Sequence, residues 1–162
     1  MIVFRPTLRF TASHPAHLVA FGFGAGLSPW APGTAGTLLA WLAGWLVGEP
    51  LATPIGLAAI AVLFALGVWV CDVTGRHLGI ADHGSMVWDE VVAFLLVLAI
   101  VPMAFGWQAA AFVLFRVFDI AKPPPIRWVE GRFKGGWGVM ADDLLAAGYT
   151  LVVLAMVQRF LP

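Results

Sequence analysis

The stretch PLATPIGLAAIAVLFALGVWVC, residues 50–71, decides the fold class, because its 22 residues carry no charged side chain. The hydrocarbon core of a bilayer is crossed by about 20 apolar residues of helix. Backbone N–H and C=O groups in lipid must be satisfied within their own segment, which favours a helix over an open strand. This stretch therefore predicts a membrane helix.

Other apolar stretches extend the pattern along the chain. Val91–Phe115 has 25 residues without a charge, interrupted near Pro102 and Gly106, and Leu144–Gln158 has 15. Thr37–Gly48 is shorter but rich in Leu, Trp and Ala. We predict five apolar helices, at residues 35–48, 54–71, 88–101, 107–120 and 142–160. The expected fold is all-α: a small polytopic membrane helical bundle, formed by residues 1–162 as a single domain.

Composition excludes several other classes of protein. The chain is 61% hydrophobic and 11% charged, whereas an ordinary soluble domain is about 25% charged. A soluble fold of this size could not bury so much apolar surface. The net charge of zero argues against a nucleic-acid partner, which would require a basic face. The single cysteine, Cys71, rules out an internal disulfide.

The positive-inside rule predicts the orientation of the bundle. With the N-terminus in the cytoplasm, the inward-facing connections 72–87 and 121–141 carry Lys and Arg, and the outward-facing connections 49–54 and 102–106 carry none. Only Arg159 falls on the wrong side. The polar stretches 22–36, 82–90 and 116–143 then share the cytoplasmic face, as one active site formed by cytoplasmic loops would require.

The first polar stretch, GFGAGLSPWAPGTAGT at residues 22–37, is rich in glycine. Glycines let backbone N–H groups approach a ligand closely, and a helix N-terminus attracts phosphate. We therefore predict that Gly33, Thr34 and Thr37 bind substrate, with Thr34 or Thr37 as the helix cap. A flexible loop that merely enters a helix remains the alternative.

Acidic pairs precede or open two of the predicted apolar helices. Asp89 and Glu90 follow Asp82 at the start of the third helix, and Asp142 and Asp143 start the last helix. Carboxylates at a helix start can simply complement the dipole. Carboxylates in membrane helices are nevertheless costly and usually functional, so we favour a metal site formed by Asp89, Glu90, Asp142 and Asp143.

Hard oxygen ligands without a cysteine or histidine cluster suit Mg²⁺ better than zinc. Mg²⁺ polarises phosphoryl oxygens and orients a hydroxide nucleophile, so the chemistry expected is phosphate hydrolysis. His83 or a carboxylate such as Asp82 would be the general base, although His83 is equally compatible with a structural role. His14, His17 and His77 lack metal-ligand spacing and are expected at the surface or at the membrane interface.

Cationic residues of the third polar stretch complete the predicted site. Arg116 and Asp119 are three apart on one helix face and could simply pair with each other. Lys134 precedes Gly135 and Gly136 in what we expect to be a mobile glycine loop. The predicted catalytic residues are Asp82, His83, Asp119, Lys122 and Lys134, and Arg116, Gly135 and Gly136 are expected to bind substrate with Gly33, Thr34 and Thr37.

Four motifs resemble those of the phosphatidylglycerophosphatase A family. They are Gly-Leu-Ser-Pro-x-x-Pro-Gly33-Thr34-x-Gly36-Thr37, Asp82-His-Gly-Ser-Met-Val-Trp-Asp89-Glu90, Phe115-Arg-x-Phe-Asp119-Ile-x-Lys122-Pro-x-Pro-Ile126 and Lys134-Gly-Gly-x-Gly-Val-Met-x-Asp142-Asp143. The resemblance spans roughly residues 20–150. One departure is Ala93, where a glycine is expected in the family.

This resemblance implies an all-helical, Mg²⁺-dependent hydrolase of the bacterial inner membrane. The implied reaction converts phosphatidylglycerophosphate to phosphatidylglycerol and phosphate. A small transporter or channel subunit that uses Asp89, Glu90 and Asp143 as an ion path is the alternative, and a non-catalytic assembly factor is a third. A transporter would place its ionisable groups near the bilayer midplane and often show internal repeats.

Overall fold

The computed structural model describes residues 6–160, without the side chains of residues 129–131, and this part of the chain is helical with no strand. Its elements are α1 (Leu8–Thr11), α2 (Pro15–Ala20), the 3₁₀ helix η1 (Gly22–Leu27), α3 (Pro32–Val47), the 3₁₀ helix η2 (Glu49–Ala52), α4 (Pro54–Leu78), α5 (Trp88–Ile100), α6 (Phe105–Ala121), α7 (Ile126–Arg132) and α8 (Gly136–Phe160). The all-α prediction is confirmed.

Each of the five predicted apolar helices is present, and α4 and α8 depart most from their predicted limits. Helix α4 continues to Leu78 and ends where Gly79 adopts a left-handed φ of 71°. Helix α8 begins at Gly136 rather than at residue 142. Only α4 and α8 are long and apolar enough to be candidate membrane spans among the described residues. Five full crossings are therefore not established, since α3, α5 and α6 have 16, 13 and 17 residues.

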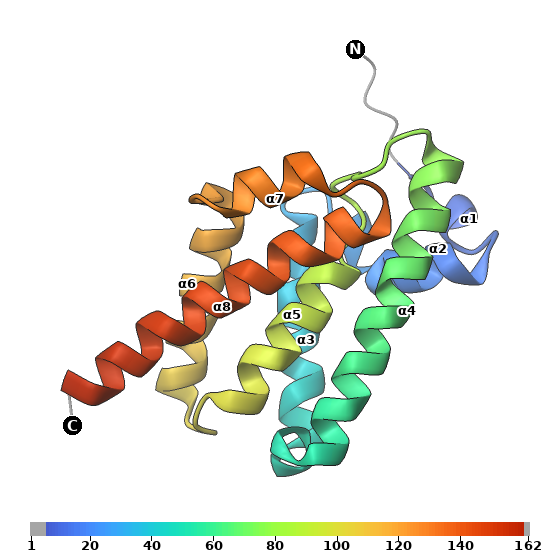
Figure 1. Ribbon diagram of the computed structural model, residues 1–162. Helices are drawn as coiled ribbons and strands as arrows, with labels where there is room; N and C mark the ends of the chain where they lie inside the picture. Colours follow the sequence, from blue (N-terminus) through green and yellow to red (C-terminus); the bar gives the residue numbers. More distant parts are fainter. Residues whose placement is uncertain (1–5, 161–162) are drawn as a thin grey trace.

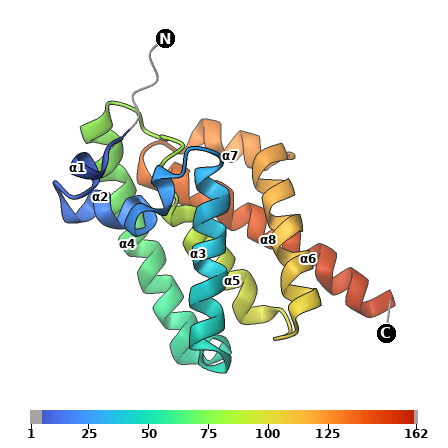
Figure 2. The same ribbon diagram turned by 180° about the vertical axis from the view of Figure 1, so that it is seen from behind.

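Helix α5 is the centre of the bundle. It lies beside α3 and α4, and α8 crosses it obliquely on the side away from α3 (Figures 1 and 2). Residues 91–95 are all buried, so α5 is enclosed on every side, as expected for a helix that is apolar all round. Helix α6 packs against α8, and α7 lies across the end where α6 finishes (Figure 1).

The polar stretches meet at one end of the bundle. Helices α3, α5 and α8 begin there, α4 and α6 finish there, and α7 lies there as well (Figure 1). The opposite end holds η2 and the short α5–α6 connection. The prediction that residues 22–36, 82–90 and 116–143 lie together is confirmed.

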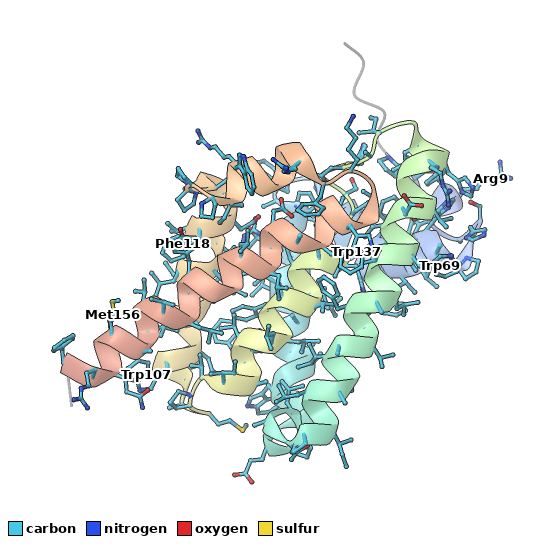
Figure 3. The ribbon with its side chains drawn as sticks, in the orientation of Figure 1. Arg9, Trp69, Trp107, Phe118, Trp137 and Met156 are labelled. Atoms are coloured by element: carbon cyan, nitrogen blue, oxygen red, sulfur yellow. The ribbon has the colours of Figure 1, made fainter. Side chains whose placement is uncertain are left out.

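Large apolar side chains cover much of the outer surface. Ile55, Val62 and Trp45 are 83%, 67% and 66% exposed. Trp137 lies toward the end of the bundle that carries the polar stretches, and Trp107 lies toward the other end (Figure 3). Extensive exposed apolar surface with aromatic residues near both ends fits a protein surrounded by lipid.

Candidate active site: a buried carboxylate cluster

Three carboxylates converge where α5 and α8 cross. Asp89 and Glu90 stand in the first turn of α5, and Asp143 lies in the second turn of α8. Oxygen atoms from these three side chains lie within 4.8 Å of one another. The start of α5 is fixed by the Val87 N–H, which donates to the Ala20 carbonyl at 2.8 Å. Residues more than 50 positions apart thus form one acidic cluster.

Each member of this cluster has an oxygen without a partner. Among the described residues, Asp89 Oδ1, Glu90 Oε2 and Asp143 Oδ2 are buried and have no hydrogen-bond partner. Burial of an unpaired charged oxygen is strongly unfavourable, and buried polar atoms in native proteins are nearly always satisfied. A hard divalent cation coordinated by carboxylate oxygens would satisfy all three, so the residues present fit Mg²⁺.

Arg116 places a positive charge directly against the cluster. Its Nη1 atom lies 3.5 Å from Glu90 Oε1 and 2.6 Å from Asp119 Oδ2. Arg116 and Asp119 do pair, which was the alternative to their predicted roles in the site, and the contact with Glu90 also links α6 to the acidic cluster. The three cluster carboxylates and Asp119 outnumber this guanidinium, and a divalent cation would neutralise the excess of negative charge.

Asp142 points to a different partner. Its Oδ2 accepts a hydrogen bond of 2.6 Å from Lys122 Nζ, and it is not a member of the three-carboxylate group. Lys122 ends α6 with a left-handed φ of 42°. The expectation that Asp142 and Asp143 open a helix is wrong, because α8 has already completed its first turn before them.

Gly33 allows α3 to approach the cluster. A Cβ atom at this position would overlap Glu90 Oε1 and lie 2.9 Å from both terminal nitrogens of Arg116. The prediction that Thr34 or Thr37 caps α3 is wrong: the N-cap is Ala31, with no side-chain hydrogen bond, and Pro32 follows it. Thr37 instead donates from Oγ1 to the Gly33 carbonyl at 2.9 Å. Proline suits the first helical position without a side-chain cap.

The predicted mobile glycine loop is instead the packed start of α8. Gly135 has a left-handed φ of 67°, and its carbonyl accepts the N–H groups of Gly138 and Val139. A Cβ atom on Gly136 would overlap the Val68 carbonyl of α4. Lys134 is exposed immediately before this helix. These glycines are explained by close helix packing.

Asp82 and His83 border a separate pocket at the same end of the bundle. The pocket has a volume of about 440 Å³ and lies between the segments 26–29 and 82–85. Asp82 is exposed, whereas His83 is buried. The Ser85 N–H donates to His83 Nδ1 at 3.1 Å, which leaves Nε2 to carry the proton of a neutral ring. His83 therefore has a structural bond, and its predicted acid–base role stays a prediction.

Sequence comparison identifies the family. Residues 18–158 match the family described as phosphatidylglycerophosphatase A. The chain belongs to the phosphatidylglycerophosphatase A family. It is therefore an enzyme of the phosphatase class, and the resemblance carried by its four motifs is confirmed.

Relatives of this phosphatase cover nearly its whole length. Phosphatidylglycerophosphatase A of Haemophilus influenzae is 42% identical over 157 residues, 96% of either chain. Phosphatidylglycerophosphatase A of Escherichia coli is 38% identical over 95% of this chain and 90% of its own. A Bacteroides thetaiotaomicron protein with the provisional name phosphatidylinositol-3-phosphatase is 42% identical over 87% of this chain and 92% of its own. No solved structure matches.

The phosphatase also contains a histidine cluster that sequence analysis missed. His17 Nε2 lies 2.8 Å from His77 Nδ1, and His17 Nδ1 lies 3.1 Å from the Phe10 carbonyl. His14 packs beside both rings. The prediction that all three histidines are at the surface or the membrane interface is wrong for His17, which is buried inside the protein at 3% exposed. Burial, aided by the charges of His77 and His14, lowers the pKa of His17. The three-residue spacing of His14 and His17 hints at a shared face, but no local pattern predicts their contact with His77.

Proposed function

We propose that this chain hydrolyses the terminal phosphomonoester of phosphatidylglycerophosphate, giving phosphatidylglycerol and phosphate in phospholipid biosynthesis. The observation that carries the proposal is the cluster of three buried carboxylates with unpartnered oxygens, in a chain of this family. The names of the Haemophilus and Escherichia relatives supply the substrate.

Asp89, Glu90 and Asp143 would hold Mg²⁺. Bound there, the ion supplies polarisation of a phosphoryl oxygen and acidification of a bound water. The three carboxylates come from two helices, so the packing of α5 against α8 fixes their relative positions before any ligand arrives. Such preorganisation is what phosphoryl transfer chiefly requires of a protein.

Neighbouring side chains orient the carboxylates and balance phosphate charge. Arg116, held by Asp119, engages Glu90 Oε1 and leaves Oε2 without a partner. Lys122, held by Asp142, keeps a fixed positive charge at the same end of the bundle. We infer that Lys122, with Lys134 from the exposed segment before α8, meets the phosphate oxygens of the substrate.

Asp82 and His83 are the acid–base groups of this proposal, because they line a pocket large enough for a glycerol head group. The exposed carboxylate of Asp82 can exchange protons with water, whereas His83 is held by the Ser85 N–H. Gly33 contributes by its small size, which leaves room for the Glu90 carboxylate beside α3. The proposed binding roles of Thr34, Gly135 and Gly136 are weakened by their places within helices or in helix packing.

The proposed location is the bacterial inner membrane, with the site at the cytoplasmic surface. The two candidate spans and the apolar outer surface support a membrane protein. Lys and Arg gather in the connections at the end that holds the carboxylates, as the positive-inside rule requires of a cytoplasmic face. There, the substrate would keep its acyl chains in lipid and present its terminal phosphate to the site.

A transporter or channel is not favoured. The acidic cluster lies toward the end where α5 begins, whereas transporter sites generally lie near the middle of the bilayer. Each carboxylate is also packed against neighbouring helices, which is more typical of a fixed binding centre than of an ion path.

The direct test is phosphate release from phosphatidylglycerophosphate by the purified protein, with Mg²⁺ or with EDTA. We expect release only with Mg²⁺, and its loss in Asp89→Asn. Asp72→Asn is the matched control, because Asp72 is a half-exposed carboxylate of α4 that pairs with Arg76 and belongs neither to the cluster nor to its partners. Full release in EDTA would overturn the metal proposal. Faster phosphate release from phosphatidylinositol 3-phosphate than from phosphatidylglycerophosphate would overturn the proposed substrate.

A further inference from the structure

A deep apolar groove runs along the outside of the bundle between α3 and α4, with α5 as its floor. Its volume is about 840 Å³. Phe23 of η1 stands at one end, and Glu49 and Thr53 stand at the other. Glu49 is the only charged residue in the lining, so nearly the whole wall is aliphatic or aromatic.

The groove ends beside the carboxylate cluster. Trp88, which lines it, immediately precedes Asp89 in the first turn of α5. The Trp88 indole is fixed by a hydrogen bond of 3.2 Å from Nε1 to the Leu63 carbonyl. The Phe23 ring meets it edge-on at 6.1 Å between centroids. Two aromatic side chains therefore mark the point where the groove reaches the level of the proposed head-group site.

The length and direction of the groove fit a hydrocarbon chain. Its lining residues Ile60 of α4 and Val91 and Leu95 of α5 are only 5%, 4% and 7% exposed, so buried core side chains form its base. The α4 residues that line it run from Ile55 to Leu63, which is about 12 Å of helix. It follows the helix axes, and lipid chains run in the same direction when such helices stand in a bilayer.

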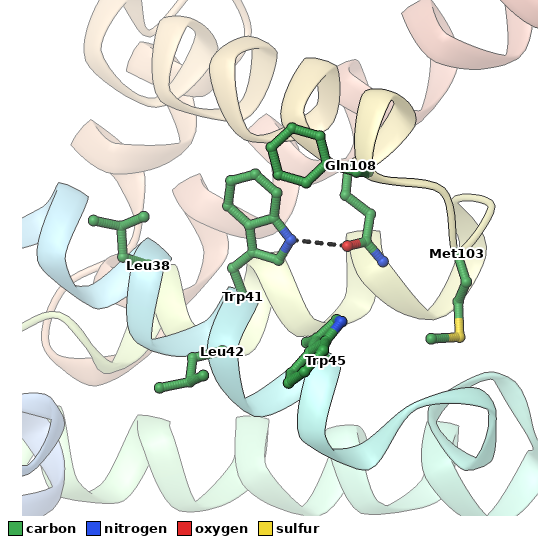
Figure 4. Close-up of a pocket in the computed structure, with 7 residues that line it drawn as sticks. Leu38, Trp41, Leu42, Trp45, Met103 and Gln108 are labelled. Carbon is green, nitrogen blue, oxygen red and sulfur yellow. Dashed lines mark hydrogen bonds between the residues drawn. The ribbon is translucent and has the colours of Figure 1, made fainter.

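A second pocket is neither as apolar as this groove nor next to the carboxylate cluster. It has a volume of about 450 Å³ and lies between α3 and the start of α6. Trp41 Nε1 donates to Gln108 Oε1 at 2.8 Å across it (Figure 4). Met103 and Phe105 place this pocket toward the end of the bundle away from the carboxylates, and a polar amide interrupts its wall.

We propose that the groove between α3 and α4 is an acyl-chain subsite, which holds one fatty-acyl chain of the phospholipid substrate while its phosphate lies at the carboxylate cluster. This inference rests on the proposed function. A chain held in the groove fixes the depth of the head group relative to Asp89. Binding energy gained far from the reacting phosphate then contributes to its positioning.

The test compares a substrate that has acyl chains with one that has none. Ala59→Trp and, as a smaller change, Ala43→Leu fill the groove from α4 and α3. We expect each to lower kcat/KM roughly tenfold or more for dioleoyl phosphatidylglycerophosphate. The rate with the deacylated, water-soluble head-group phosphomonoester should not change. Ala58→Trp is the matched control, because Ala58 is exposed on α4 and does not line the groove.

The outcomes are separable. An equal loss with both substrates, or no loss with either, overturns the acyl-chain subsite while leaving the phosphatase reaction intact. If the unmodified protein releases phosphate from neither substrate, the proposed function fails instead. The groove is then tested by photo-crosslinking with a phosphatidylglycerol that carries a diazirine on one acyl chain. Adducts on Val91 and Leu95 that disappear in Ala59→Trp support the subsite, and their absence overturns it.

Discussion

At the scale of single residues, Asp143 shows the conflict between stability and activity. It is 3% exposed, and its Oδ2 has no hydrogen-bond partner among the described residues. Asp143→Asn removes the charge but keeps the shape. Phosphate release should fall by roughly 100-fold or more, since even outer-shell changes cost 10–100-fold in metal sites. The thermal midpoint in EDTA should not fall and should rise, because repulsion within the cluster is reduced.

The two measurements belong together. Activity assays with Mg²⁺ and thermal denaturation with EDTA, both in detergent, should move in opposite directions for Asp143→Asn. Asp72→Asn should change neither, because it removes only an exposed ion pair with Arg76. A variant that loses activity and stability together would show that Asp143 has a structural role, and retained activity would contradict its place in a metal site.

Gly33 tests whether the position of Glu90 matters. Gly33→Ala would push against the ends of two side chains, Glu90 and Arg116, rather than against backbone. Those ends can move, so the thermal midpoint should change little, but the displaced carboxylate should lower phosphate release roughly 10- to 100-fold. Gly106→Ala is the control, because a Cβ atom there meets nothing within 4 Å. Equal activity in both variants would contradict the argument.

The sequence was enough to choose the carboxylates of the candidate site, but it predicted only part of their contacts with one another and with the cationic residues. Asp89, Glu90 and Asp143 could be chosen because carboxylates are rare beside apolar helices. Asp142 and Asp143 are neighbours along α8 and therefore point in different directions, so one joins the cluster and the other pairs with Lys122. Which of them does so depends on where α8 lies, and that is a tertiary property.

At the scale of elements, the start of α8 depends on glycine. The sequence suggested a loop before residue 142, because Gly135, Gly136 and Gly138 weaken a helix. Contact with α4 overrides that tendency. The Val68 carbonyl lies where a Cβ atom of residue 136 would be, and the Phe133 carbonyl lies 2.4 Å from where one of residue 138 would be.

Gly136→Ala should therefore destabilise the fold by about 1–3 kcal/mol, as overpacking usually does, because backbone cannot move aside as a side chain can. Thermal or denaturant unfolding in detergent measures the effect. Gly148→Ala is the matched change in the same helix, and it meets nothing within 4 Å. It should be neutral or stabilising by up to about 1 kcal/mol. Equal stability of the two variants would contradict the crossing of α4 and α8.

The docking of α2 on α4 should weaken in acid. Burial lowers the pKa of His17 below its ordinary value of 6.5, so the folded state binds this proton less readily than the unfolded state does. Stability from neutral His17 is complete above pH 6.5 and is lost as pH falls below it. The thermal midpoint should drop between about pH 7.5 and about pH 5.5. His17→Gln should reduce that dependence, and an unchanged slope would contradict the role of His17.

At the scale of the whole molecule, the uncharged apolar stretches and the placement of Lys and Arg predicted a helical bundle. Lipid permits few other structures for such stretches, so the five long helices and the gathering of the polar stretches at one end could be predicted. The short helices α1, α2 and α7 could not be found in the same way. They lie outside the long apolar stretches, and their positions depend on tertiary contacts: α2 packs against α4, α7 against α8, and α1 against α2 and η1.

The sidedness of the bundle can be tested with its cysteine. Cys71 is fully buried, so it should not react with a membrane-impermeant maleimide. Thr53→Cys lies at the η2 end and should be labelled in intact spheroplasts. Arg127→Cys lies in α7, at the end that holds the carboxylates, and should be labelled only after the membrane is permeabilised. The reverse pattern would place the active site outside the cytoplasm.

The same assay decides whether α5 and α6 reach the outer surface. Helix α5 has 13 residues and spans about 20 Å, whereas the hydrocarbon core is about 30 Å thick. The connection at Met103 should therefore lie below the outer boundary of the membrane. We expect Met103→Cys to react more slowly than Thr53→Cys with the impermeant reagent, and both to react with a permeant one. Equal rates with the impermeant reagent would show that the bilayer thins around the α5–α6 pair or that the pair crosses it completely.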